Sequence, residues 1–200
     1  LMRSSRAVII AALLIPCLAC LAQQANPITN GSFEQLGPDG WALDWERVGL
    51  EVSITADAHS GQHAVLLNRT AEAIEKKVET GLNRLWKPNS GQQGTMLSQR
   101  KGGVIFWYKV PQAPKTAHLR FFIIPMSADP MENTGGQRAW YEVPADHLSD
   151  GQWHEGKVAY DFTDNEKCRW VHISPRIISD EPAQWIIDDI ESVESIGPLA

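Results

Sequence analysis

The sequence is poor in cysteine, has no late apolar run long enough to span a membrane, and carries no excess of positive charge. Cys17 and Cys20 lie in the N-terminal segment, so Cys168 alone remains and no internal disulfide can form in the rest of the chain. Burial of apolar side chains, or a bound ion, must therefore hold the fold together. We interpret Cys168 as a small buried residue at the entrance to a strand.

The first 22 residues have the three-part layout of a secretory signal. Arg3 and Arg6 form the basic part, residues 7–15 are apolar, and small residues follow up to Ala22. The apolar part is shorter than the roughly 20 residues that a transmembrane helix needs. Two processing routes stay open, cleavage after Ala22 or attachment of a lipid to Cys20. Either route predicts an extracytoplasmic protein, freely secreted or anchored in the cell envelope, with no transmembrane segment.

The acidic charge balance narrows the choice of partner. Without residues 1–22, 16 Lys and Arg face 24 Asp and Glu, which gives a net charge of −8. Such a surface disfavours nucleic acid and anionic membranes, but not a neutral glycan. Residues 28–200 show no second composition regime and no repeat, so we expect one domain and a monomer.

Short runs rich in apolar residues, separated by Gly, Pro and Asp, dominate the chain and predict strands. They span residues 52–55, 63–68, 96–100, 104–110, 118–124, 139–143, 153–162, 169–178 and 185–193. This number of antiparallel strands fits an all-β sandwich or jelly roll. Residues 71–84 differ: Ile74, Val78 and Leu82 have helical spacing after the N-cap candidate Thr70. They predict one short inserted helix, although Gly81 is unfavourable in a helix and weakens this prediction.

Three separated segments occur in a set order along the chain. They are Asn30-Gly31-Ser32-Phe33-Glu34 followed by Gly40-Trp41, the run AHSGQHAVL at 58–66, and WIIDDI at 185–190. Together with the runs at 104–110 and 151–162, they resemble the carbohydrate-binding modules of the galactose-binding-like jelly-roll superfamily, the cellulose- and xylan-binding kind. The resemblance covers residues 28–194 and implies a jelly-roll domain over that range.

The resemblance also implies a structural calcium ion, because the two chain ends of these modules meet at a calcium site. The matching positions supply the carboxylates of Glu34 and Asp188 and the backbone carbonyls of Ser32, Ser60 and His63. A hard cation that gathers oxygen ligands at about 2.3–2.6 Å can clamp two such segments. The alternative stays open that Glu34 is a solvated turn residue and Asp188 lies on the polar side of a strand.

Alternation within the strands predicts a ligand-binding face. Leu119, Phe121 and Ile123 form an apolar row, whereas the opposite side carries large polar and aromatic residues where small polar ones would be expected. An aromatic ring can cover the apolar face of a sugar while polar groups bind its hydroxyls. The predicted groove consists of Arg120, Trp140, Glu142, Trp170, His172 and Arg176.

Two other interpretations of this face remain. The two tryptophans can instead pack under the helix or a loop, and Arg120 and Glu142 can form a cross-strand ion pair. Trp86, in the loop after the expected helix, is then the best exposed aromatic alternative.

The sequence favours a non-catalytic module that recognises an extracellular polysaccharide or glycoconjugate. Asp188 and Asp189 are neighbours on one strand, so we expect them to face opposite ways and not to act as a catalytic pair. Phosphate loops, serine elbows and Cys–His signatures are absent from the sequence. The alternative function is a structural or protein-interaction β-sandwich of a secreted or cell-surface protein.

Overall fold

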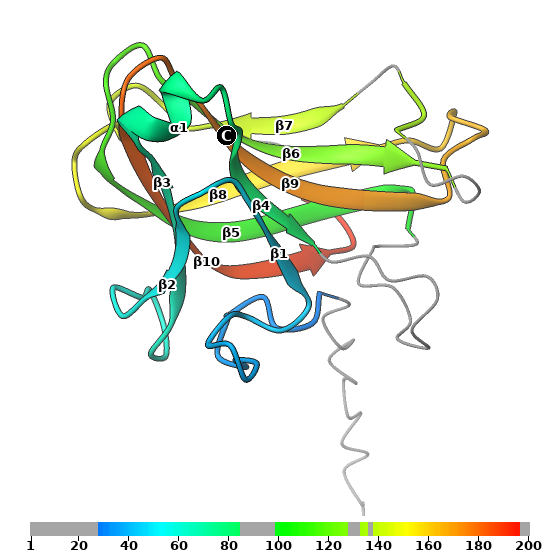
Figure 1. Cartoon of the computed structure of the whole chain (residues 1–200). Coiled ribbons are helices and arrows are strands. Elements are labelled where there is room, and N and C mark those ends of the chain that lie inside the picture. The colour runs from blue at the N-terminus through cyan, green and yellow to red at the C-terminus, as the bar shows by residue number, and fades with distance from the viewer. Residues whose placement is uncertain (1–27, 85–98, 128–132, 136–137, 197–200) are drawn as a thin grey trace, which may run out of the picture.

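The computed structural model describes residues 28–84, 99–127, 133–135 and 138–196 (Figure 1). The signal segment, Cys20 and Trp86 lie outside these residues. None of the helices described could reach across a membrane. The elements in chain order are β1 (Trp45–Val48), β2 (Val52–Thr55), β3 (Ala64–Arg69), α1 (Ala71–Glu75), β4 (Thr80–Arg84), β5 (Lys101–Gln112), β6 (His118–Met126), β7 (Ala139–Glu142), β8 (Trp153–Asp161), β9 (Trp170–Ile178) and β10 (Ala183–Val193).

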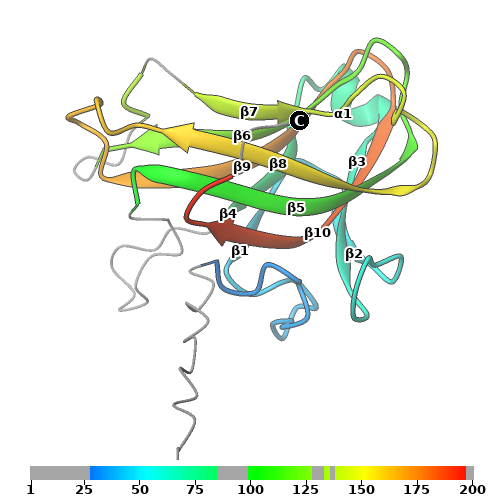
Figure 2. The ribbon, with the colours of Figure 1, turned by 180° about the vertical axis from the view of Figure 1, so that it is seen from behind.

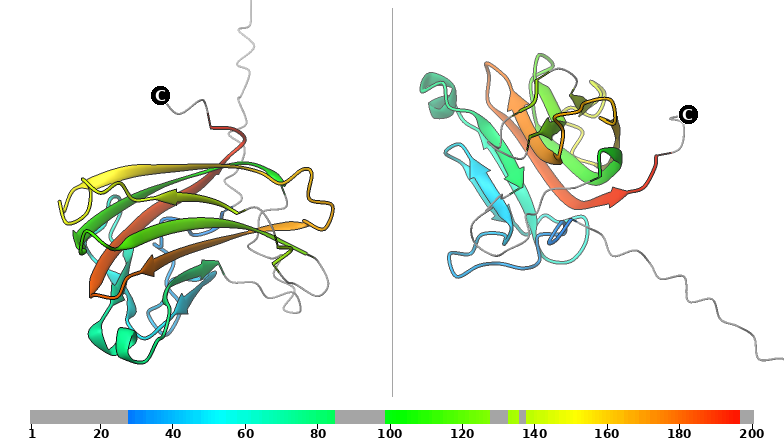
Figure 3. Two further views of the ribbon diagram at one scale, coloured as in Figure 1. Left: turned by 90° about the horizontal axis from the view of Figure 1, so that it is seen from above. Right: turned by 90° about the vertical axis from the view of Figure 1, so that its right-hand side faces the viewer.

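The strands form two five-stranded antiparallel sheets that are stacked face to face (Figures 1 and 2). We call them the β9 sheet, with the order β1-β4-β9-β6-β7, and the β10 sheet, with the order β2-β3-β10-β5-β8. The predicted antiparallel β-sandwich of jelly-roll type with one short helix is confirmed. The helix α1 lies at one end of the sandwich (Figure 3).

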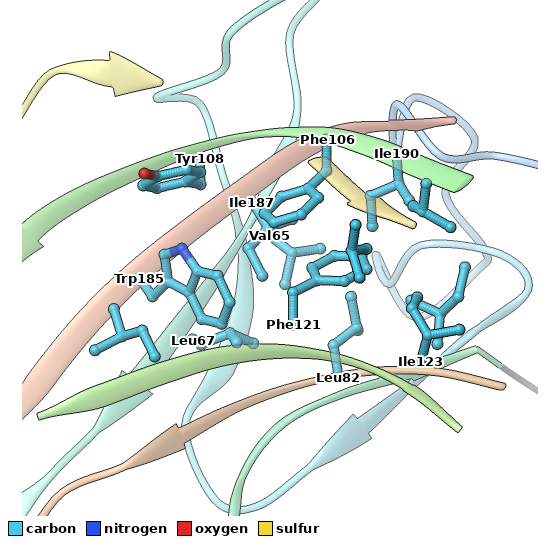
Figure 4. Packing of buried hydrophobic residues seen from close by; sticks show 14 of the residues in the cluster. Val65, Leu67, Leu82, Phe106, Tyr108, Phe121, Ile123, Trp185, Ile187 and Ile190 are labelled. Carbon is cyan, nitrogen blue, oxygen red and sulfur yellow. The ribbon is translucent and has the colours of Figure 1, made fainter. Parts of the chain in front are cut away.

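The core lies between the inner faces of the two sheets (Figure 4). Phe106 of the β10 sheet stacks on Phe121 of the β9 sheet, with ring centroids 3.9 Å apart. Trp185, Leu67 and Leu82 are fully buried around this pair. Each side chain of this size stabilises the fold by about 1.5–3 kcal/mol when fully buried, so packing can hold the sandwich without a disulfide. Cys168 is also buried, two residues before β9, as interpreted from the sequence.

The helix predicted over residues 71–84 is too long. The hydroxyl of Thr70 does cap it, because Thr70 Oγ1 accepts a hydrogen bond from the Ala73 N–H at 3.2 Å. The helix nevertheless ends at Glu75, and Lys77 has a φ of 53°, which no helix continues.

Residues 80–84 form the strand β4 instead of the end of a helix. Thr80, Leu82 and Arg84 are buried at alternate positions between the sheets, so strand pairing prevails over helical spacing. The strand β1 had no signal in the sequence analysis. The strand expected at 96–100 is not found in its described part, since β5 begins at Lys101.

Candidate functional site

The six predicted groove residues lie on the outer face of the β9 sheet, turned away from the core. Leu119, Phe121 and Ile123 on β6 are fully buried, so the alternate side chains of β6 face outward. Arg120 lies opposite Glu142 on β7 and Arg176 on β9.

Phe122, which the groove prediction did not include, lies opposite Trp140 on β7 and Ser174 on β9. Trp140 has 52% of its surface exposed and is not covered by the helix. Trp170 lies six residues from Arg176, or about 20 Å along β9. The structure therefore places the six residues on one face, but not in one cluster.

Glu142 is the centre of a polar group at the β7 edge of this face. Its Oε2 accepts a hydrogen bond from Arg120 Nε at 2.9 Å, and its Oε1 bonds His118 Nδ1. Burial alone would raise the pKa of Glu142, but the hydrogen bonds from His118 and Arg120 hold it below its ordinary value. The cross-strand ion pair considered from the sequence thus exists. In the described part of the chain, no hydrogen bond uses the two Nη atoms of Arg120, which remain able to donate.

A second polar group is centred on Asn83 of β4, which the sequence analysis missed. Its Oδ1 accepts hydrogen bonds from Arg176 Nη2 at 2.7 Å and Ser174 Oγ at 3.2 Å, and lies 3.1 Å from His172 Nε2. Burial and the charge of Arg176 lower the pKa of His172 to about 4, so the imidazole is neutral at pH 7. We therefore assign the proton to Nε2, where it bonds Asn83.

Gly81 makes room for Arg176 on this face. A Cβ at Gly81 would lie 2.6 Å from Arg176 Nη1. The guanidinium can therefore lie across β4, where Nη1 donates to the carbonyls of Leu82 at 2.8 Å and Pro175 at 2.9 Å. These bonds fix the position of its charge, although burial lowers the pKa of Arg176 somewhat.

Beside these groups the outer face is hollowed by a depression of about 350 Å³. Its lining combines apolar side chains with two guanidinium groups and one carboxylate. The lining residues are Glu79, Phe122, Ile124, Arg138, Ser174, Arg176, Ile177 and Ile178. A hollow that combines apolar surface with a few placed polar groups is typical of small-ligand sites.

The rim of the sandwich brings the two ends of the domain together. Glu34 Oε1 accepts the N–H groups of Gln62 and His63, both at 2.8 Å. Asp188 Oδ2 accepts those of His59 at 2.9 Å and Ser60 at 3.2 Å. The same turn is therefore bound by the opening segment and by the last strand, through backbone N–H groups.

Asp188 and Asp189 do not face opposite ways, so this expectation is wrong. Asp189 bonds His59 Nδ1 at 2.7 Å and Ser60 Oγ at 2.8 Å, the same two residues that Asp188 contacts. The strand register shifts between Asp188 and Glu191, and Asp189 has a φ of 47°. A bulge of this kind breaks the alternation on which the expectation depended.

The rim carries oxygen atoms of the chemical kind that hard cations bind, from Glu34, Asp188 and nearby backbone carbonyls. Asp188 is fully buried, and its partners among the described residues are backbone N–H groups, not cationic side chains. Burial raises its pKa to about 6. The carbonyls of Ser32, Ser60 and His63 accept no hydrogen bond in the described part of the chain.

The side chains of the described residues do not form a metal site by themselves. Over the described ranges, no group of three or more His, Cys, Asp or Glu side chains is placed to hold a metal. An ion at the rim would therefore depend on backbone carbonyls in addition to Glu34 and Asp188.

Comparison with solved structures shows the same fold in carbohydrate-binding modules. The xylan-binding domain of family 22 is 14% identical, with a TM-score of 0.52 over 86% of this chain and 96% of that chain. The second module of family 16 is 16% identical, with a TM-score of 0.51 over 84% of this chain and 100% of that chain. The chain thus has the β-sandwich fold of these modules.

A third similar structure is the enzymatically active domain of tailspike protein 4 from bacteriophage CBA120. It is 12% identical with a TM-score of 0.52, and the match covers 84% of this chain but only 21% of that chain. No protein-family model and no curated protein sequence matches the chain.

Proposed function

We propose that the chain is a non-catalytic extracellular module that binds a polysaccharide or glycoconjugate on the outer face of the β9 sheet. The observation that carries this proposal is Trp140, which is 52% exposed on an edge strand directly beside the hydrogen-bonded Arg120 and Glu142. An exposed indole can stack on the C–H face of a sugar. The polar neighbours can then bind its hydroxyl groups.

The hydrogen-bond networks of this face favour binding because they fix the polar groups in advance. Glu142 is held by His118 and Arg120, and Arg176 is held by Asn83 and two carbonyls. Side chains that are already ordered lose little further entropy when a ligand arrives. The face can therefore bind a sugar without rearranging.

The spacing of carboxylates on this face supports binding without hydrolysis. Two strands, β6 and β9, separate Glu142 on β7 from β4, and Glu79 directly precedes β4. Glu46 on β1 is one strand further away. At about 4.8 Å between strands, these separations are about 14 Å and about 19 Å. These are separations between backbones, and the Glu79 carboxylate is directed at Arg176 Nε, 3.4 Å away, instead of at a second carboxylate; a glycosidase sets its two carboxyl groups about 5–9.5 Å apart across a bound sugar. The Asp188–Asp189 pair is engaged by the turn at the rim, and Asp188 is fully buried.

The binding proposal is tested by affinity electrophoresis of the full chain through a panel of soluble polysaccharides. We expect Trp140→Ala to weaken binding at least about tenfold, since ring stacking contributes about 1–2 kcal/mol together with its buried area. Trp140→Phe should retain part of the affinity. Trp153→Ala, on the outer face of the β10 sheet, is the matched control and should bind as the parent does.

The alternative function makes the opposite prediction. A folded parent protein that migrates unretarded through every polysaccharide would contradict glycan binding. The structural or protein-interaction role would then be favoured.

We also propose that the rim holds a structural Ca²⁺ ion. The carboxylates of Glu34 and Asp188 and the carbonyls of Ser32, Ser60 and His63 would hold it, and its charge would offset the burial of Asp188. We expect the chelator EGTA to lower the Tm, and Ca²⁺ but not Mg²⁺ to restore it, because Mg²⁺ demands smaller octahedral sites. Asp188→Asn should lose this response. An identical Tm with chelator and with Ca²⁺ would refute the site.

We propose that the protein works outside the cytoplasm, on the basis of the N-terminal signal. Mass spectrometry of the mature protein distinguishes cleavage after Ala22 from a lipid on Cys20. An unprocessed N-terminus in exported material would contradict both routes.

A further inference from the structure

The depression on the outer face of the β9 sheet is lined by two guanidinium groups. Arg138, immediately before β7, and Arg176, on β9, both line it. Glu79 is the one carboxylate among its described lining residues, and its side chain is 75% exposed. The hollow therefore has more positive than negative groups, on a chain whose net charge is −6.

The two arginines differ in how their charges are compensated. Arg176 lies 3.4 Å from Glu79 and donates to Asn83 and two carbonyls. Arg138 is exposed, and within the described ranges it forms no ion pair and no hydrogen bond. Its guanidinium is thus free to bind a ligand, whereas that of Arg176 is already anchored.

The surroundings of Arg138 suit a ring with an anionic substituent. Phe122 and Ile124 supply apolar surface beside it, and Trp140, two residues after Arg138, lies opposite Phe122 in the sheet. A guanidinium binds a carboxylate or a sulfate through two parallel N–H bonds. Apolar surface next to a free guanidinium is the arrangement that a charged sugar needs.

We infer that the ligand of this face is an acidic glycan, in which Arg138 binds a uronate carboxylate or a sulfate group while the sugar ring covers Phe122 and Ile124. This inference rests on the proposed glycan binding and specifies its substrate class. The negative net charge opposes unspecific attraction of polyanions. Recognition of an acidic glycan must therefore come from this local group of residues.

The test compares polysaccharides that share a backbone but differ in charge. The probes are polygalacturonate against fully methyl-esterified homogalacturonan, and dextran sulfate against dextran, measured by calorimetry on the full chain at 50 mM and 300 mM NaCl. The first pair reports on carboxylate and the second on sulfate. A panel of neutral cellulose-, xylan- and mannan-derived oligosaccharides is measured alongside.

We expect the charged member of at least one pair to bind about tenfold or more tightly than its neutral partner, and the difference to shrink at high salt. Arg138→Gln should remove most of this preference, and Arg138→Lys should restore part of it. Lys157→Gln, which removes the same charge from the outer face of the β10 sheet, is the matched control and should keep the preference. Arg138 is exposed, and Lys157 forms a surface ion pair with Glu155 that contributes little to stability, so we expect all these variants to keep the parent Tm.

The remaining outcomes separate this inference from the proposed function. Equal binding of charged and neutral partners, binding of neutral oligosaccharides alone, or a preference that survives Arg138→Gln overturns the acidic-glycan inference and leaves glycan binding intact. Binding to none of the charged or neutral probes overturns both.

Discussion

Replacing Asn83 by Ala should destabilise the protein and disorder the outer face at the same time. Asn83 Oδ1 accepts one charge-assisted hydrogen bond from Arg176 and neutral ones from Ser174 and His172. A bond to a charged group contributes about 1.5–3 kcal/mol and a neutral one about 0.5–1.5 kcal/mol. Because water can replace part of them at a half-buried site, we expect a loss of about 3 kcal/mol.

The loss is measured by urea unfolding and by the Tm. For a domain of this size, about 3 kcal/mol corresponds to a fall in Tm of about 6–12 °C. Asn83→Asp keeps the acceptor oxygens and adds a charge beside Arg176, so it should retain most of the stability. Asn68→Ala, whose side chain bonds exposed Glu51, should change the Tm by little. If Asn83→Ala unfolds within 1 °C of the parent, the network does not carry the stability that its geometry suggests.

Two further predictions concern pH and the rim. Folding lowers the pKa of His172 from an ordinary 6.5 to about 4. As the pH falls, the imidazole is therefore protonated in the unfolded chain before it is protonated in the folded one. Stability should therefore be complete above about pH 6.5 and fall by about 3 kcal/mol as the pH drops to about 4. His172→Gln should flatten this part of the profile in pH-dependent urea unfolding, and an unchanged slope would contradict the buried neutral imidazole. Gly61→Ala, at a φ of 64° and with its new Cβ 2.3 Å from Glu34 Oε1, should lower stability by about 1–3 kcal/mol in the same assay. The matched control is Gly151→Ala, which has a similar φ but whose new Cβ meets no atom within 4 Å. It should lower stability only by the cost of a positive φ, without the steric clash.

The strands that could be predicted most fully from the sequence are those with one apolar and one polar side. Residues 118–124 alternate between core and outer face, and the same pattern placed Trp140 and His172 on the outer side. Burial on one side of a sheet produces this period directly, so no knowledge of neighbouring strands is required. The residues of the rim were predicted instead from the resemblance of short motifs to a known family, because their positions depend on turns and not on periodicity.

The parts that could not be predicted depend on contacts distant in sequence. Residues 71–84 have helical spacing, but pairing of Gly81 with Arg176 on β9 makes their second half a strand. Because the sequence analysis did not predict this strand, it did not identify Asn83 as a residue of the outer face. The strand β1 has no apolar alternation to reveal it, since only Trp45 is fully buried. Arg138 was missed because its place beside Phe122 and Ile124 follows from the register of β6 and β7, not from the order of residues.

The hydrogen bond between Ile190 N and Gly31 O, at 2.9 Å, joins the opening segment directly to the last strand. Tension applied to the two ends of the domain would therefore be resisted first at this junction and at the turn beside it. The outer face of the β9 sheet would stay out of the path of the force. A ligand bound to that face, as proposed, would therefore stay bound while the two ends of the domain are pulled.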